Sequence, residues 1–312
     1  MEKVLIVATK GHFILYKAAL EDYANNHENI SLDFFVLDFP KVSGLAKIQY
    51  KLNIGSFRQN YYEQKRKELI NLLNKYDTIL FYNVFFDQEY FIQGKLKQKL
   101  KEKHTKVYFV DSIRKSNLSK DILEIFREIF VFEERDVQYI KDTFQLDAQW
   151  VTCGTSYYLF TENIAKQNEK IYDVCFVGLA TTKRLEYLDV IAKWCSKNNV
   201  TLFVAGHFWH SNHKINYWLG KLKFKKKHPY LAKYVKNCFI QPYDLAGIYA
   251  KSKIVLNINI SEHKGFNQRA FDIILSNSLL ICDNQDVNGL EIKNGIDFVS
   301  SKNIDHMIKN IS

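Results

Sequence analysis

Arg269 and Asp272 lie three residues apart in the stretch Asn-Gln-Arg-Ala-Phe-Asp (267–272), which follows an apolar run. In a helix that starts near Asn267, the two side chains share one face of the first turn. A guanidinium there can bind a diphosphate with two hydrogen bonds, and a carboxylate can accept both hydroxyls of a ribose. A salt bridge between Arg269 and Asp272 is the alternative, and the spacing alone favours it because such surface pairs are common.

A second candidate anion site follows the apolar run 174–177, where Gly178 is succeeded by Leu-Ala-Thr-Thr-Lys-Arg (179–184). Free backbone N–H groups and the helix dipole favour a phosphate at such a strand-to-helix turn, and Lys183 and Arg184 add positive charge. The chain contains neither G-x-G-x-x-G nor a Walker A sequence. An ordinary turn carrying a solvated Lys–Arg pair is an equally good interpretation.

Four residues are candidate general bases because each comes just after an apolar run. His12 follows the first run in the loop Thr-Lys-Gly-His (9–12), and Asp87, Glu89 and Asp111 follow later ones. An imidazole with a pKa near neutrality can deprotonate an acceptor hydroxyl. A lone loop histidine is more often a hydrogen-bonded structural residue, so both interpretations of His12 stay open.

Short apolar runs that alternate with amphipathic stretches must position these residues. We expect strands at 4–8, 32–37, 78–82, 107–110, 129–132, 174–178, 201–205, 254–260 and 279–282, and helices at 15–25, 63–73, 95–103, 185–197 and 270–276. Strands that read as continuous apolar runs and are joined by helices indicate parallel sheets covered on both faces. The sequence therefore predicts an α/β protein of two Rossmann-like, doubly wound domains that face a central cleft. The polar stretch 153–170 predicts the linker, which gives domains 1–160 and 161–312.

Composition supports two soluble domains. The chain has 312 residues, 47% of them hydrophobic, and no apolar run approaches the roughly 20 residues of a membrane-spanning helix. The apolar run 4–8 is too short for a signal peptide, so we expect a cytoplasmic protein. The five cysteines are an odd number without a C-x-x-C pair, which predicts buried free thiols and no zinc site.

The basic charge needs a partner or is merely solvated. Lys+Arg number 44 against 34 Asp+Glu, a formal net charge of +10. The segment Lys-Leu-Lys-Phe-Lys-Lys-Lys (221–227) follows Tyr217-Trp218-Leu219, and a similar mix of basic and aromatic residues occupies 57–66. Such segments bind anionic membrane surfaces or nucleic acids, although a solvated charge run is the default interpretation.

From Tyr243 to Asp283 the sequence resembles the donor-binding half of CgeB-like glycosyltransferases, which have the GT-B fold. The resemblance rests on Leu256-Asn257, Gly265, Asn267, Arg269, Phe271, Asp272, Leu279, Leu280 and Asp283. Phe176-Val177-Gly178 with Arg184 resembles the opening of that family's C-terminal domain, and 132–136 with Gly154 its interdomain approach. The resemblance is specific over about 170–285 and loose over the N-terminal half.

The resemblance implies a transferase that moves a sugar, of the hexosyl type, from a nucleotide-sugar donor to a saccharide acceptor held by the first domain. The acceptor would be lipid-linked, for capsule or lipopolysaccharide (O-antigen) assembly, with peripheral contact at the inner face of the membrane. The implied donor-binding residues are Gly178, Lys183, Arg184, Asn257, Lys264, Gly265, Asn267, Arg269 and Asp272. Arg269 would stabilise the leaving diphosphate, with His12 or Asp87 as base, and neither metal nor cofactor would be needed.

One departure from the pattern leaves the stereochemistry open. Related retaining transferases carry a glutamate eight residues before the ribose carboxylate, and Lys264 stands at that position here, with Glu262 close by. A nucleotide-sugar epimerase of the same fold would use the same donor site without an acceptor. A basic nucleic-acid-binding protein is the third interpretation, but no recognised binding motif supports it, so no nucleic acid is expected.

Overall fold

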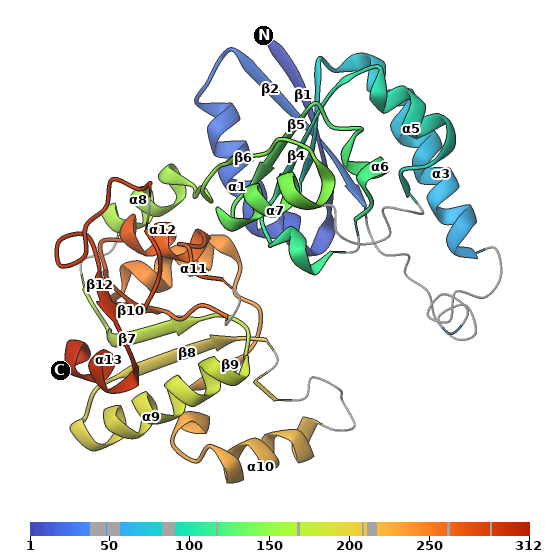
Figure 1. The fold of residues 1–312 in the computed structure, drawn as a ribbon. Helices are drawn as coiled ribbons and strands as arrows, with labels where there is room; N and C mark the ends of the chain where they lie inside the picture. The colour runs from blue at the N-terminus through green and yellow to red at the C-terminus, as the bar shows by residue number, and fades with distance from the viewer. Residues whose placement is uncertain are drawn as a thin grey trace. The chain divides into compact units, whose positions relative to one another are not determined.

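The computed structural model describes residues 1–37, 48, 57–82, 91–116, 118–166, 169–207, 209–210, 217–260, 263–287 and 289–312, with the side chains of 10–15, 57–58, 115 and 165 left undescribed. The chain divides into two compact units, Met1–Thr152 (unit 1) and Cys153–Ser312 (unit 2). Each unit holds one six-stranded sheet in which all neighbouring strands are parallel. The predicted α/β class with two doubly wound sheets is confirmed (Figure 1).

Unit 1 has the strand order β2-β1-β3-β4-β5-β6. Its elements are β1 (Glu2–Thr9), α1 (Lys10–Asn25), β2 (Ile30–Leu37), α3 (Phe57–Leu72), η1 (Leu73–Lys75), β3 (Thr78–Tyr82), α5 (Gly94–Lys101), β4 (His104–Phe109), η2 (Ile113–Lys115), α6 (Lys120–Leu123), β5 (Glu128–Val131), α7 (Arg135–Phe144) and β6 (Gln149–Trp150). Strand β1 alternates between the two faces of the sheet. Leu5 and Val7 join a large cluster with residues of α3 and α5, whereas Ile6 and Ala8 pack with residues of α1. Helices therefore cover both faces.

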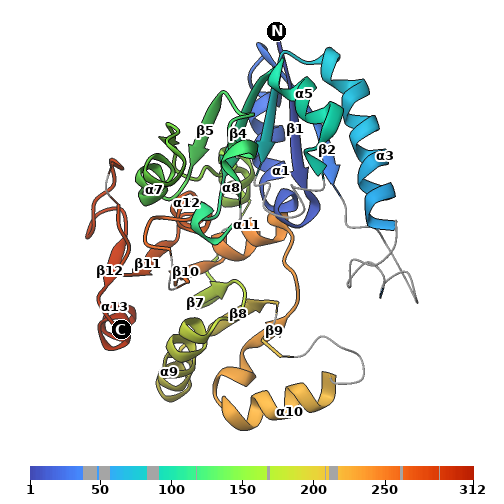
Figure 2. The ribbon, with the colours of Figure 1, turned by 45° about the vertical axis from the view of Figure 1, so that its right-hand side comes forward.

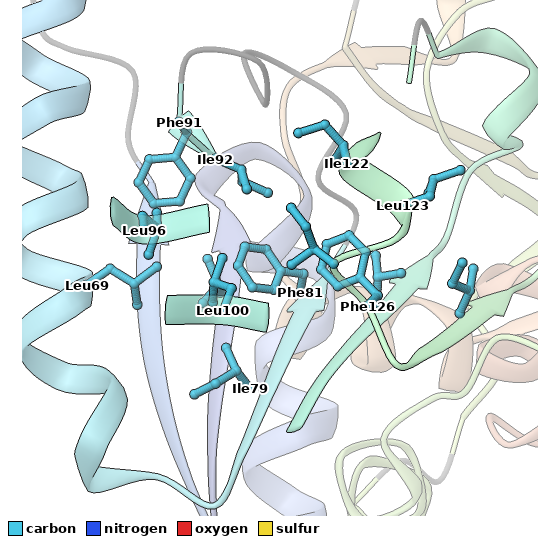
Figure 3. Packing of buried hydrophobic residues seen from close by; sticks show 14 of the residues in the cluster. Leu69, Ile79, Phe81, Phe91, Ile92, Leu96, Leu100, Ile122, Leu123 and Phe126 are labelled. Atoms are coloured by element: carbon cyan, nitrogen blue, oxygen red, sulfur yellow. The ribbon is translucent and has the colours of Figure 1, made fainter. Parts of the chain in front are cut away.

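The large cluster is the core of unit 1, and Figure 3 shows how its side chains interlock. Leu69 of α3 and Leu96 and Leu100 of α5 are fully buried against Ile79 and Phe81 of β3. Three helical residues and two strand residues thus close the same face of the sheet. Burying aliphatic and aromatic side chains in this way is the main favourable contribution to folding.

Unit 2 has the strand order β12-β11-β10-β7-β8-β9. Its elements are α8 (Tyr157–Ala165), β7 (Tyr172–Val177), α9 (Thr182–Asn198), β8 (Leu202–Gly206), α10 (Tyr217–Lys227), η3 (Leu231–Lys233), β9 (Val235–Asn237), α11 (Pro242–Ala250), β10 (Ser252–Asn257), α12 (Gln268–Ile274), β11 (Leu279–Asp283), β12 (Val299–Ser301) and α13 (Ile304–Ile311). Residues of α8, α11 and α12 pack on one face of the sheet, and residues of α9 and α13 pack on the other. Figure 2 shows these two helical layers from a second direction.

The strand orders place one topological switch point in each unit. In unit 1 the chain leaves β1 toward β2 and returns to β3 on the other side of β1. In unit 2 it leaves β7 toward β8 and β9 and returns to β10 on the other side of β7. Open parallel sheets bind ligands outside the carboxyl ends of their strands at such a point. A ligand-binding site is therefore expected at the segments that follow β1, β3, β7 and β10.

Every predicted strand is present, but two helical regions differ from expectation. His12 was expected in a loop, whereas α1 begins at Lys10, directly after β1. The stretch 153–170 was expected to be a linker, but it contains α8, which Ser156 caps by accepting a hydrogen bond from the Leu159 amide at 3.1 Å. The sequence did not predict this helix, because the polar residues Thr161 and Asn163 interrupt its apolar pattern. In the structure, both side chains bond back to the preceding helical turn. The expected boundary at 160/161 falls inside α8, and the two units meet at 152/153.

The five cysteines are free thiols, as predicted, and four of them are buried. Cys238 differs, since it is exposed. Burial raises the pKa of Cys175 and of Cys282 to about 12, which keeps both thiols protonated and unreactive. No helix within the described residues is long and apolar enough to cross a membrane.

Candidate functional site

Arg269 lies at the switch point of unit 2. Helix α12 begins at Gln268 with Asn267 at its N-cap, as the sequence predicted, so Arg269 is in its first turn. The guanidinium donates from Nη1 to the side-chain oxygen of Asn257, the last residue of β10, at 3.0 Å. It also lies over the ring of Phe176 in β7, with its carbon 5.2 Å from the ring centroid. Arg269 thus spans the ends of the two strands between which the chain reverses its direction of winding.

The carboxyl of Asp272 is near enough to interact with the charge of Arg269, but the direct contacts described for Arg269 are to neutral groups. Its contacts are a neutral amide, an aromatic ring and the hydroxyl of Tyr249. Among the described residues, no aspartate or glutamate forms an ion pair with it. A guanidinium held by neutral partners keeps its attraction for an external anion, and its planar donors match a phosphate.

Asp272 does not pair with Arg269, although the spacing alone favoured that salt bridge. Its carboxylate is buried and accepts a short hydrogen bond from the hydroxyl of Thr155, a residue of the segment before α8. Burial raises the pKa of Asp272 from 3.8 to about 7, while the Thr155 bond and the charge of Arg269 oppose the rise. Asp272 therefore fixes the 153–156 segment to α12 and is half-protonated near neutral pH.

Gly178 and Gly206 allow the ends of β7 and β8 to approach closely. A Cβ on Gly178 would lie 2.6 Å from Nη2 of Arg269, so the guanidinium occupies the space that any side chain would fill. Gly206 has φ +140°, and a Cβ on it would lie 1.9 Å from the carbonyl oxygen of Gly178. Only glycine has access to that backbone conformation without strain. The two glycines together let Arg269 reach the edge of the sheet.

Arg184 is buried, and two of its N–H donors are bonded within the chain. Its Nε donates to the carbonyl of Ile258 at 2.8 Å, and its Nη1 donates to the carbonyl of Leu179 at 3.0 Å. Burial and the neighbouring charge of Arg269 lower its pKa to about 9. Arg184 ties the segment after β7 to the segment after β10, and it contributes positive potential.

Lys183 forms an ion pair with the buried carboxylate of Asp283 at the end of β11. Asp283 also accepts from the amide of Asn259 at 3.2 Å and from the side-chain amide of Gln285 at 2.6 Å. Gln285 in turn bonds to both the side chain and the carbonyl of Asn257. A buried polar network therefore holds the ends of β10 and β11 in one arrangement.

Asn259 and Asn267 order the segment that precedes α12. The side chain of Asn259 donates to the carbonyl of Gly265 at 2.9 Å and accepts from Asn267 at 2.6 Å. Gly265 forms a parallel bridge with Asp286, and Lys264 beside it is exposed. Asn267 keeps a buried side-chain oxygen that has no hydrogen-bond partner among the described residues. Glu262 lies outside the described residues.

Several residues of this network were missed from the sequence as site residues. Thr155, Asn259, Asp283 and Gln285 hold the predicted ones in place. Trp209, which follows β8, packs edge-on against Phe176 with the ring centroids 6.1 Å apart. A polar residue just beyond a strand end was the available signal, since Asn259 and Gln285 each come two residues after one.

The whole chain is similar in structure to several solved proteins. HepE from Anabaena, solved with UDP and glucose, matches with a TM-score of 0.65 at 12% identity, covering 100% of this chain and 89% of that one. A glycosyltransferase from Rickettsia africae matches with a TM-score of 0.63 at 13% identity, covering 99% and 87%. The UDP-GlcNAc 2-epimerase from Methanocaldococcus jannaschii matches with a TM-score of 0.53 at 11% identity, covering 100% and 92%.

The chain has the GT-B fold. At such low identities the similarity extends to the fold alone. No protein-family model and no curated protein sequence matches the chain. The CgeB-like subfamily therefore stays a prediction, carried by the residues quoted from 176 to 283.

One predicted base of the N-terminal unit, His12, lies at the other switch point. His12 is in the first turn of α1, after β1. Asp87 and Glu89 follow β3 but lie outside the described residues, so their role stays a prediction. Asp111 follows β4 at the same edge of the sheet. The hydroxyl of Thr9, where β1 ends, is buried without a hydrogen-bond partner among the described residues.

A metal site was not expected, and the described residues contain no group of three or more His, Cys, Asp or Glu side chains that could hold an ion. In the C-terminal unit the arrangement instead gathers cations. Among the described residues, Lys183 pairs with Asp283, whereas neither Arg184 nor Arg269 forms an ion pair with a carboxylate. The chemistry that this arrangement supports is binding of an anion with several oxygens.

Proposed function

We propose that the chain is a glycosyltransferase that takes its sugar from a nucleoside-diphosphate sugar bound at the switch point of unit 2. The observation that carries the proposal is Arg269, a cation with neutral partners at the place where a GT-B fold can bind a ligand. Similarity to HepE, solved with UDP and glucose, supports a sugar nucleotide as the ligand. UDP-sugars are accordingly the first donors to test.

In the proposed reaction, the glycosidic bond to the diphosphate breaks and negative charge develops on the leaving group. Arg269 would donate two hydrogen bonds to that diphosphate, and the positive potential of Arg184 and Lys183 would add to its stabilisation. The first turn of α9 before Arg184 offers further N–H donors. Asn257 orients Arg269 by accepting from Nη1. This set of cations performs the charge stabilisation without a metal ion.

Asp272 would bind the ribose of the donor. The carboxylate already accepts from the hydroxyl of Thr155, so it is positioned to accept hydroxyl groups. A pKa near 7 means that ribose binding strengthens as pH rises and the carboxylate ionises. Lys264, at the position of the missing glutamate, and Gly265 would lie toward the donor sugar.

The acceptor would be a saccharide held by unit 1, with His12 or Asp87 as the base that removes the hydroxyl proton. Both residues belong to the segments that follow β1 and β3. A lipid-linked saccharide of the kind used in capsule or lipopolysaccharide assembly is the acceptor class we propose. Nuclear magnetic resonance of the anomeric proton in the product shows whether the configuration of the transferred sugar is retained or inverted.

The first test replaces Arg269. Arg269→Ala should lower the turnover of a radiolabelled sugar nucleotide by about a hundredfold or more, the typical effect of removing one charge-stabilising donor. The same change should remove the thermal stabilisation that UDP gives the wild-type protein. Arg127→Ala, which removes an exposed arginine from unit 1, is the matched control and should leave both unchanged. Unchanged turnover in Arg269→Ala would overturn the site.

An epimerase is the second candidate, because the 2-epimerase from Methanocaldococcus jannaschii has a similar structure over the whole chain. An epimerase acts on the donor sugar alone, so it needs no acceptor. Incubation with UDP-GlcNAc in the absence of any acceptor separates the two functions. Appearance of a second UDP-sugar would support the epimerase, and release of UDP only after a saccharide is added would support the transferase.

A further inference from the structure

Helix α10 (Tyr217–Lys227) carries more exposed apolar surface than its sequence of mixed residues suggests. Trp218, Leu219 and Leu222 are 70%, 58% and 60% exposed. No residue of α10 is buried. Large aliphatic and aromatic side chains that lie together and face outward mark a surface that another body covers.

The orientation of α10 is fixed by the residues on its inner face. Tyr217 and Phe224 lie seven residues apart and therefore on the same side of the helix. Both contact the ring of His210, with centroid distances of 5.0 and 6.3 Å, and Phe224 also packs into the cluster between α9 and the sheet. Trp218, Leu219 and Leu222 consequently face away from unit 2. Figures 1 and 2 both draw α10 at the rim of that unit.

Lysines flank the three apolar side chains. At 100° per residue, Lys221 and Lys225 lie on one side of the Trp218–Leu219–Leu222 ridge, and Lys223 and Lys227 lie on the other. Lys226 lies within the ridge, and the helix contains no acidic residue. We define the α10 face as these three apolar residues together with these five lysines. An apolar ridge between two rows of lysines matches the boundary between acyl chains and anionic headgroups.

The second basic and aromatic segment of the chain lacks this character. It forms α3, and Tyr62 on that helix is only 5% exposed and packs against Phe91 with ring centroids 6.3 Å apart. Lys65 pairs with Glu68 of the same helix at 2.6 Å. The aromatic surface of α3 thus belongs to the core of unit 1, and its charges are partly neutralised.

We infer that the α10 face docks on an anionic lipid bilayer. Two other occupants fit the face less well. A second copy of the chain would bring five lysines against five lysines, and this repulsion opposes self-association. A nucleic acid would contact the lysines and Trp218, but the exposed leucines would not contribute to binding a phosphate backbone or stacked bases. The inference rests on the exposure and charge of α10 and is independent of the proposed transferase activity.

The test is co-sedimentation of the full chain with vesicles of phosphatidylcholine alone, or with about 30% phosphatidylglycerol, at about 0.1 M salt. We expect at least about tenfold stronger partitioning onto the anionic vesicles. The triple change Trp218→Ser, Leu219→Ser and Leu222→Ser should reduce that partitioning about tenfold or more. Changing all five lysines of the α10 face to Gln should abolish the preference for phosphatidylglycerol.

Ile296→Ser is the matched control, because Ile296 is 76% exposed elsewhere in unit 2 and should not contribute. Circular dichroism and UDP-induced thermal stabilisation report whether each variant stays folded. If the triple variant unfolds, Leu222→Ser alone and the salt dependence of wild-type binding replace it. Equal binding to both vesicle types, or serine variants that bind like wild type, would overturn the inference. Tighter binding to a single-stranded RNA that survives the serine changes would assign the face to nucleic acid instead.

Discussion

In unit 1 the switch point lies between β1 and β3, and in unit 2 it lies between β7 and β10. The polar groups around these two sheet edges are satisfied differently. In unit 1, buried Asp136 accepts from Ser112, from the amide of Ile113 and from Arg114, so a carboxylate and a cation neutralise each other. In unit 2, Arg269 has neutral partners, and the buried carboxyl group nearest to it along α12 bonds to Thr155 instead.

The difference teaches which polar groups at a sheet edge hold the fold and which are available to a ligand. A buried carboxylate with three donors of its own chain stabilises the loops that it joins and has most of its acceptor sites occupied. A cation with neutral partners retains most of its attraction for an anion. Both edges are polar, but among the described residues only the edge of unit 2 has a cation, Arg269, whose direct partners are neutral and which can bind an anion. Three substitutions test this division, beginning with the largest expected loss of stability.

Asp136→Ala should destabilise unit 1 by about 3 kcal/mol, because it leaves the Ser112 hydroxyl and the Ile113 amide buried without an acceptor and removes the partner of Arg114. The affinity for UDP should stay within about twofold of wild type wherever the variant is folded. Urea unfolding and calorimetric titration measure the two quantities. A large loss of UDP affinity in folded protein would mean that the edge of unit 1 also serves the donor.

Asp272→Asn should change how stability depends on pH. The pKa of Asp272 is raised from 3.8 to about 7 in the folded protein, so the native state holds a proton that the unfolded state has lost in that window. Native stability from this group is therefore complete below pH 3.8 and declines as the pH rises toward 7. The variant should match wild type near pH 4 and be more stable by about 4 kcal/mol at pH 8, because the two pKa values differ by about three units and each unit corresponds to about 1.4 kcal/mol.

Urea unfolding of both proteins from pH 4 to 8 is the measurement for Asp272→Asn. Parallel stability curves would contradict the raised pKa. The same variant should bind UDP more weakly than wild type at pH 8, because a neutral amide accepts ribose hydroxyls less strongly than a carboxylate. A gain in the free energy of unfolding together with a loss of affinity for UDP would show that Asp272 binds the ligand and that its carboxylate destabilises the folded protein.

Gly178→Ala should have the smallest effect on stability, about 1 kcal/mol, because the new methyl group meets a side chain that can move. Its effect on UDP affinity should be larger, about tenfold, since Nη2 of Arg269 must leave the position 2.6 Å from the new Cβ. Gly154→Ala is the matched control, because a Cβ there has nothing within 4 Å. Equal UDP affinities of the two variants would show that the position of Arg269 is unimportant.

The sequence by itself determined nine of the twelve described strands, all but the short β6, β9 and β12, together with the start of α12 near Asn267 and the strand-to-helix turn at Gly178. These features follow from local signals, namely continuous apolar runs and the polar residues that interrupt them. Two local conflicts misled it. The polar residues Thr161 and Asn163 interrupt the apolar pattern of α8, and Gly11 at the start of α1 suggested a loop around His12.

Only the tertiary structure decided which groups pair. Spacing favoured a bond between Arg269 and Asp272, yet sheet order brings Asn257 to the first and Thr155 to the second. The sequence left open that Arg184 is a solvated cation, whereas in the structure its Nε donates to the carbonyl of Ile258, just after β10. Likewise, α3 and α10 have similar compositions, but packing buries Tyr62 of the first and leaves Trp218 of the second exposed. Pairing and burial depend on residues distant in the chain, so no local pattern contains them.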